Sequence, residues 1–212
     1  MKTLIQCDFD GTITEEDASF FLLDKFAQGD WRGLFQQYRE HKISVGEFNT
    51  RAFAMVKEDK HTLLQALEGN VKLRAGFHGL VDHCRERGFS FVIVSNGLDF
   101  YIREVLKESG LGDLDVHAAQ ASFHPTGMKV RYVGPNGKTV DDGFKDAYIE
   151  SFLGLGFRVI YIGNGDSDIA PANQAHRVFA TGDLLAYSKE NNLNCKPFTD
   201  FREVVQDLEQ MS

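Results

Sequence analysis

Four short segments of the chain are almost continuously apolar. They are rich in β-branched and aromatic residues, and they span residues 3–7 (TLIQC), 89–94 (FSFVIV), 157–162 (FRVIYI) and 177–180 (RVFA). A strand that is apolar on both faces is typical of a parallel sheet covered by helices on both sides. We therefore predict four strands in the interior of an α/β domain.

Helical patterns separate these segments. Their apolar residues recur at intervals of three and four positions, as expected for one buried face of a helix. Because strands alternate with helices, the pattern predicts a three-layer, Rossmann-like parallel sheet with right-handed crossovers. The buried positions expected for four of the helices are Phe77, Leu80, Val81 and Cys84; Leu98, Ile102, Val105 and Leu106; Tyr148, Ile149, Phe152 and Leu153; and Phe201, Val204, Val205 and Leu208.

The stretch from residue 13 to residue 75 breaks this alternation, because it contains helical patterns and no clear strand. Ser44 and Glu47 form a capping-box pattern at the start of one of these helices. We predict a helical insertion over residues 14–75, within a core formed by residues 1–13 and 76–212. A Pro-Asn-Gly turn between two β-like runs also predicts a small β-hairpin over residues 127–140.

Composition and charge narrow the class of protein. The chain has 212 residues, of which 42% are hydrophobic and 25% charged, as in an ordinary globular protein. Its formal net charge of −8 argues against a nucleic-acid or anionic-membrane partner. No signal peptide and no apolar run near the roughly 20 residues of a membrane span are visible, so we expect a cytoplasmic protein. The sequence leaves open whether it is a monomer or a homodimer. The three cysteines form no CxxC pair, which fits a reducing compartment.

Polar residues follow the first three predicted strands. In an open parallel sheet, ligands bind outside the carboxyl ends of the strands. Carboxylates suit Mg²⁺, whereas lysine and loop N–H groups suit phosphate, so the set predicts a phosphoryl-transfer site. The cation and the ammonium would offset repulsion between the carboxylates. The residues are Asp8, Asp10, Gly11 and Thr12; Ser95, Asn96 and Gly97; Asn164, Asp166 and Asp168; and Lys145, which opens the helix before the third strand.

The order and spacing of these motifs resemble the haloacid dehalogenase superfamily over essentially the whole chain. The motifs are DFDGT (8–12), VSNG (94–97), Lys145 and GNGDSD (163–168). The helical insertion is similar to the small helical cap of phosphoserine phosphatases. Three further segments resemble the branch of 2-hydroxy-3-keto-5-methylthiopentenyl-1-phosphate phosphatases of methionine salvage. These segments are FVIVSNGLDFYI (91–102), ASF (121–123) and the run at 184–204.

The resemblance implies a role for each motif. Asp8 would attack phosphorus and form an aspartyl-phosphate, and Asp10 would act as general acid and then as general base. The phosphate ligands would be Gly11, Thr12, Ser95, Asn96, Gly97 and Lys145. The ligands of Mg²⁺ would be Asp8, Asp10 through its carbonyl, Asn164 and Asp168.

Some positions depart from the family pattern or leave two interpretations open. Relatives usually carry aspartate in place of Asn164, so Asp166 or Asp168 could compensate, or metal affinity could be lower. Asp17 could meet a substrate amine or cap a helix. Phe20 could roof the pocket, and Arg51 could meet a substrate carboxylate. The run DDGFK (141–145), which ends at Lys145, lacks the cysteines that are frequent in the methionine-salvage branch.

We therefore expect a Mg²⁺-dependent phosphatase of a small phosphorylated metabolite. The leading substrate is the methionine-salvage keto-enol phosphate, and the alternative is phosphoserine or a phosphorylated amino alcohol. Carbon–halogen cleavage is disfavoured because such relatives lack the second aspartate, Asp10. A phosphotransferase and, because of Asn164, a non-catalytic metabolite-binding protein are the alternatives from other classes.

Overall fold

The computed structural model describes residues 2–210, and within this range the sheet has seven strands in the order β4-β3-β2-β1-β5-β6-β7. All neighbours pair in parallel except β3 and β4, which are antiparallel. The predicted Rossmann-like fold class is confirmed. The strands are β1 (Thr3–Cys7), β2 (Ser90–Leu98), β3 (Asp115–Ser122), β4 (Lys129–Arg131), β5 (Arg158–Gly163), β6 (Arg177–Ala180) and β7 (Lys196–Pro197).

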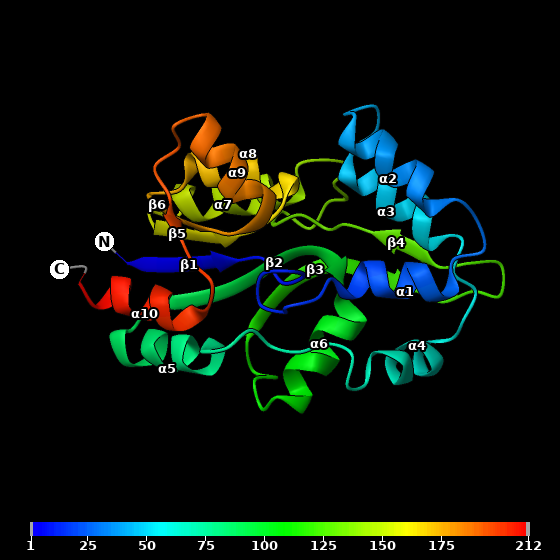
Figure 1. The fold of residues 1–212 in the computed structure, drawn as a ribbon, viewed down its shortest axis with the longest axis horizontal. Coiled ribbons are helices and arrows are strands. Elements are labelled where there is room, and N and C mark those ends of the chain that lie inside the picture. The colour runs from blue at the N-terminus through cyan, green and yellow to red at the C-terminus, as the bar shows by residue number, and fades with distance from the viewer. Residues whose placement is uncertain (1, 211–212) are drawn as a thin grey trace.

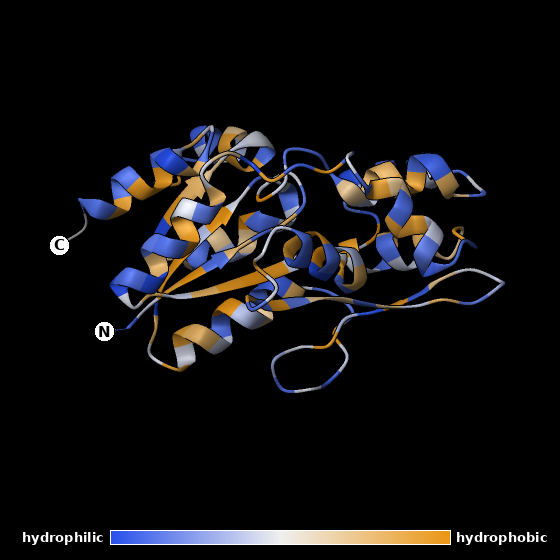
Figure 2. Ribbon diagram, turned by 90° about the horizontal axis from the view of Figure 1, so that it is seen from below, coloured by the Kyte–Doolittle hydropathy of each residue, from blue (hydrophilic) through white to orange (hydrophobic). Residues whose placement is uncertain are grey.

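Helices cover both faces of the sheet (Figure 1). One layer holds α5 (Phe77–Arg87), α6 (Asp99–Glu108) and α10 (Phe201–Glu209), and the other holds α7 (Phe144–Gly154), α8 (Ile169–Gln174) and α9 (Gly182–Glu190). The central strands are mainly hydrophobic, whereas the helices carry both hydrophobic and hydrophilic residues (Figure 2). Between residues 2 and 210, no helix has the length and apolar character needed to cross a bilayer.

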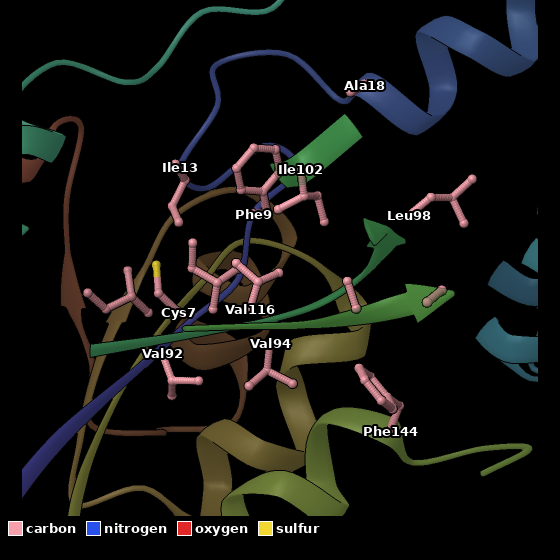
Figure 3. Packing of buried hydrophobic residues seen from close by; sticks show 14 of the residues in the cluster. Cys7, Phe9, Ile13, Ala18, Val92, Val94, Leu98, Ile102, Val116 and Phe144 are labelled. Carbon is pink, nitrogen blue, oxygen red and sulfur yellow. The ribbon is translucent and has the colours of Figure 1, made fainter. Parts of the chain in front are cut away.

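Side chains pack against the central strands from both sides. Phe9 and Ile102 lie on one side of β2, and Val94 and Phe144 lie on the other (Figure 3). None of these four is more than 3% exposed. This packing fixes the end of β1, where the first of the predicted motifs begins.

Four helices stand between β1 and α5, as the sequence predicts. They are α1 (Ala18–Phe26), α2 (Trp31–Arg39), α3 (Val45–Phe53) and α4 (Lys60–Leu67), and we call them the helical insertion. Each starts at an N-cap whose side chain accepts a backbone N–H: Asp17, Asp30, Ser44 and Asp59. The segments that lead into and out of the insertion pair between Thr14 and Leu73. The domain boundaries at 13/14 and 75/76 stay a prediction.

Three details of the sheet differ from the expected pattern. The sequence analysis missed β3, whose run DVHAAQAS has few β-branched residues. It ended β2 at residue 94, but the strand continues to Leu98, and its register against β3 shifts between Val94 and Leu98. The predicted turn at 135–137 is present, because Val133 bridges Thr139, but its first flanking run forms β4 and pairs with β3.

The segment around β4 fastens the helical insertion to the core. The backbone N–H of Met128 donates to the carbonyl of Val56 at 3.0 Å. A Cβ at Gly127 would lie 2.0 Å from the carbonyl oxygen of Ala54, so only glycine permits this approach. Asn49 of α3 also donates to the Tyr132 hydroxyl at 2.7 Å. The insertion is therefore attached at a third place besides its two connecting segments.

Candidate active site

Lys145 lies between two buried aspartates at the carboxyl end of the sheet. Its Nζ is 2.9 Å from Asp8 Oδ1 and 2.6 Å from Asp168 Oδ1. The lysine is 2% exposed, Asp8 6% and Asp168 0%. β1, α7 and the loop after β5 thus bring together three residues that the sequence analysis placed in one site.

The Asp168 carboxylate is fully engaged with the protein. Its Oδ1 accepts from Lys145 and from the Tyr161 hydroxyl, each at 2.6 Å. Its Oδ2 accepts the backbone N–H groups of Asn164 at 2.9 Å and Gly165 at 2.8 Å. A carboxylate has about four acceptor sites. None is left for the cation that the sequence analysis assigned to Asp168, whose position instead makes it the anchor of Lys145.

The buried charges shift one another's titration. Burial raises the pKa of the Asp8 carboxyl from 3.8 to about 7, although the Lys145 ammonium lowers it. Burial opposes the charge on Lys145, but Asp168 and Asp8 outweigh it and raise the pKa of the ammonium above its ordinary value. Burial likewise opposes the charge on Asp168, yet Lys145, Tyr161 and Gly165 together hold the pKa of its carboxyl below the usual value. Two carboxylates and one ammonium leave this trio one negative charge in excess.

Oxygen atoms gather around the side-chain amide of Asn164. Its Oδ1 accepts the Thr12 hydroxyl at 2.8 Å. The same amide position lies 3.2 Å from Asp8 Oδ2 and 3.1 Å from the carbonyl oxygen of Asp10. Oxygen ligands arranged around Mg²⁺ at about 2.1 Å lie about 3 Å from one another. The distances of Asn164 Oδ1 from Asp8 Oδ2 and from the Asp10 carbonyl oxygen fit this spacing. With the amide turned over, its nitrogen would instead donate to all of them.

The Asp10 carboxylate accepts a hydrogen bond at each of its two oxygens. Its Oδ1 accepts the backbone N–H of Ala18 at 3.0 Å, and its Oδ2 accepts the Tyr101 hydroxyl. Burial raises the pKa of the Asp10 carboxyl well above its usual range, with Asp17 and Asp8 adding to the rise. Within residues 2–210 no three His, Cys, Asp or Glu side chains are placed to share a metal ion. A metal here would therefore rely on the Asp10 carbonyl and the Asn164 amide beside Asp8.

The predicted phosphate ligands divide into two groups. Ser95, Asn96 and Gly97 line a cavity of about 190 Å³ together with Lys145. Gly11 and Thr12 do not line it: the Gly11 N–H donates to Thr14, and the Thr12 hydroxyl donates to Asn164. These two residues shape the loop behind Asp8, and nothing in their arrangement supports contact with phosphate.

Aromatic residues of the helical insertion form the far wall of this cavity. Phe20, Phe35 and Phe48 line it, with the rings of Phe20 and Phe35 packed edge to face at 4.8 Å. Asp17 lines it as well and also caps α1 by accepting the Phe20 N–H at 2.8 Å, so both interpretations of Asp17 have a structural basis. Arg51 is absent from the lining and pairs with Glu47 on the exposed side of α3.

A charged bridge closes one side of the cavity. Arg39, at the end of α2, pairs with Asp166 at 2.9 Å and also with Asp183 at the start of α9. All three residues line the cavity. The bridge joins the helical insertion to the loop after β5, and it gives Asp166 a partner other than a metal.

Sequence reasoning missed several residues of this site. Tyr101 and Ser19 support Asp10, and Tyr161 supports Asp168. Arg74 donates to the carbonyl oxygens of Gly11 and Thr12 and so braces the loop after β1. Hydroxyls of tyrosine inside apolar helix or strand patterns give no signal in the sequence, because their partners are set by the fold. Arg74 lies in the connection between α4 and α5, and the sequence around it gives no signal of this role.

The sequence profile of the family described as haloacid dehalogenase-like hydrolase matches residues 5–172. The chain belongs to this family. Two curated relatives are each called 2-hydroxy-3-keto-5-methylthiopentenyl-1-phosphate phosphatase. The one from Brevibacillus brevis is 30% identical over 99% of this chain and 96% of its own. The one from Bacillus mycoides is 26% identical over 100% and 98%.

Solved structures of the family share the fold of this hydrolase. A phospho-aspartyl intermediate analogue of phosphoserine phosphatase has a TM-score of 0.73 at 18% identity, covering 97% of this chain and 98% of its own. A substrate-bound phosphoserine phosphatase complex has a TM-score of 0.70 at 18% identity, covering 98% of each. Together with the full-length relatives, the family match makes this chain a phosphoric monoester hydrolase, as predicted.

Proposed function

We propose that this phosphatase is Mg²⁺-dependent and acts through an aspartyl-phosphate on Asp8. The observation that carries the proposal is the placement of Asp8: Oδ1 is held by Lys145 at 2.9 Å, while the residue faces the 190 Å³ cavity. A carboxylate held in a fixed orientation at the cavity can attack a bound phosphoryl group. Lys145 then offsets charge on the phosphoryl oxygens as it develops.

The two chemical steps divide between Asp8 and Asp10. In the first, an Asp8 oxygen bonds to phosphorus, the bond to the leaving oxygen breaks, and Asp10 gives that oxygen a proton. In the second, Asp10 takes a proton from water and the water oxygen bonds to phosphorus. The bond between phosphorus and the Asp8 oxygen breaks, which releases phosphate and restores the Asp8 carboxylate. Ser95 and the N–H groups near Gly97 are the proposed ligands of the phosphoryl oxygens. The helical insertion, as a cap, excludes bulk water from the first step.

Asp8, the Asp10 carbonyl and the Asn164 amide oxygen are the proposed Mg²⁺ ligands, supported by the distances of 3.2 Å and 3.1 Å from the Asn164 amide to Asp8 Oδ2 and to the Asp10 carbonyl oxygen. Bound there, Mg²⁺ would supply positive charge to the nucleophile and to the phosphoryl group. Asp168 is assigned to hold Lys145 instead of the metal. Because the amide of Asn164 is neutral, we expect weaker Mg²⁺ binding than an aspartate would give.

The proposed substrate is 2-hydroxy-3-keto-5-methylthiopentenyl-1-phosphate. The names of the full-length relatives support it. The wall formed by Phe20, Phe35 and Phe48 suits an apolar thioether tail. Among the described residues that line the cavity, the cations are Lys145 and Arg39, and both are already paired with aspartates. A substrate carboxylate, such as that of phosphoserine, would find no free cation.

A phosphorylated amino alcohol is the second candidate. Asp17 favours it, because this acid lines the cavity and could pair with a substrate amine. Burial raises the pKa of Asp17 to about 6, so at neutral pH the side chain is largely ionised and able to pair.

A panel of phosphorylated metabolites, compared by kcat/KM with Mg²⁺ present, tests these assignments. We expect the keto-enol phosphate to exceed phosphoserine and phosphoethanolamine by at least about tenfold, as expected for loss of one good contact. The matched control is Asp8→Asn, which should abolish turnover of every member. A faster reaction with phosphoethanolamine would transfer the assignment to the second candidate. Transfer of phosphate to added alcohols in preference to water would make the protein a phosphotransferase.

A further inference from the structure

The Tyr101 hydroxyl occupies a buried position that the roles above leave unexplained. Tyr101 lies on α6, is 0% exposed, and packs its ring near Phe9. Its hydroxyl donates to Asp10 Oδ2 and lies 2.7 Å from the Ser19 Oγ of α1. Phenylalanine would fill nearly the same space and would bury no hydroxyl group that needs a hydrogen-bond partner. The hydroxyl therefore has a specific partner in the carboxylate.

The surroundings of Asp10 fix its carboxylate from two directions. The Ala18 N–H holds Oδ1 from the helical insertion, and Tyr101 holds Oδ2 from the core. Gly97 makes the second contact possible, since a Cβ there would lie 2.2 Å from the Tyr101 hydroxyl and 2.3 Å from Asp10 Oδ2. Two donors on separate oxygens leave the carboxylate one orientation.

We propose that Tyr101 is a positioning residue for Asp10, with Ser19 completing the hydrogen-bond chain. The proposal rests on the assignment of Asp10 as general acid and base. The phenol donates to one lone pair of Oδ2 whether Asp10 is ionised or protonated, so the remaining positions of the carboxyl group stay available for the proton that is passed to the leaving oxygen. Because the phenol proton is given to Asp10, the Ser19 hydroxyl donates to the phenol oxygen. The carboxyl group then keeps one orientation while its proton passes to the leaving oxygen and is regained from water.

This role predicts a dependence on the leaving group that a purely structural role does not. An alkoxide leaves only with a proton from the acid, whereas 4-nitrophenolate leaves without one. General acid catalysis contributes about 10²- to 10⁴-fold, and a mispositioned acid forfeits part of it. For Tyr101→Phe we expect kcat/KM for n-butyl phosphate to fall about 10- to 100-fold. For 4-nitrophenyl phosphate it should fall less than about threefold.

Two further variants complete the test. Ser19→Ala should shift the ratio of the two kcat/KM values in the same direction by a smaller factor. Tyr148→Phe, which removes a hydroxyl bonded to the Val133 carbonyl away from the cavity, should leave the ratio unchanged. Thermal unfolding of each variant identifies any that fail to fold, and Ser19→Ala then decides alone.

Equal losses for both substrates in Tyr101→Phe, or no loss for n-butyl phosphate, would overturn the role of Tyr101. These outcomes differ from failure of the proposed function. In that case the unaltered enzyme would hydrolyse neither substrate, or Asp8→Asn would retain turnover.

Discussion

Removing the nucleophile should stabilise the metal-free enzyme. Asp8, Lys145 and Asp168 bury one more negative charge than positive, and Asp8→Asn leaves a neutral ion pair in its place. The Asp8 pKa is about 7 in the folded chain against 3.8 ordinarily, and this difference corresponds to about 4 kcal/mol. The free energy of unfolding of Asp8→Asn at pH 8 in EDTA should exceed that of the unaltered enzyme by up to this amount, reduced by the free energy of the lost contact with Lys145.

The sign of the pH dependence follows from proton binding. Between pH 3.8 and about 7 the folded chain keeps a proton on Asp8 that the unfolded chain releases. The free energy of unfolding contributed by Asp8 therefore falls as pH rises through this range and is lowest above pH 7. The amide introduced by Asp8→Asn does not titrate in this range, so the two proteins should approach each other in stability near pH 4.

Urea unfolding at pH 4.5 and pH 8, with EDTA or with Mg²⁺, measures these differences. We expect the variant to be more stable at pH 8 in EDTA, and Mg²⁺ to stabilise the unaltered enzyme but not the variant. A variant less stable than the parent at pH 8 in EDTA would refute the excess-charge argument. A stability difference between the variant and the parent that is the same at pH 4.5 and pH 8 would refute it as well.

Three other predictions concern residues around the same cavity. Asn164→Asp adds a charged ligand, so the Mg²⁺ concentration for half-maximal activity should fall about tenfold or more; an unchanged value in a metal titration would place the metal elsewhere. Asp168→Asn removes the anchor of Lys145 and turns an NH₂ toward two backbone donors, so it should cost about 3–5 kcal/mol in urea unfolding and lower kcat at least about 100-fold. Arg39→Gln breaks a half-exposed bridge, so its unfolding free energy should change by less than about 1 kcal/mol while its KM rises. The control variant Arg51→Ala should change neither quantity. Equal KM values for the two arginine variants would count against a role of the bridge in substrate binding.

The sequence predicted the elements whose local pattern matches their final environment. The strands at residues 3–7 and 157–162 are apolar on both faces and are buried on both faces. β3 was missed because its alanines carry little β signal and because it is held by pairing with two other strands, β2 in parallel and β4 in antiparallel orientation. Here the tertiary context outweighs local propensity.

The candidate site was likewise predictable only in part. Asp8 and Lys145 were predicted to lie together because the carboxyl ends of parallel strands and the starts of the helices between them meet at one edge of the sheet, and the structure places them 2.9 Å apart. The orientation of a carboxylate depends on which donors reach it from distant segments, such as Tyr161 for Asp168. That information is absent from a single sequence, which explains why the sequence analysis gave Asp168 to the metal.

The attachment of Met128 to Val56 has a consequence for engineering. Specificity in families of this architecture invites grafting of one relative's helices onto another's core. Here foreign helices on this core would leave the N–H of Met128 without the carbonyl of Val56 and would set a foreign surface against Gly127, where no side chain fits. A workable exchange must carry the strand-and-turn segment around β4 along with residues 14–75, so that both sides of the seam come from one parent.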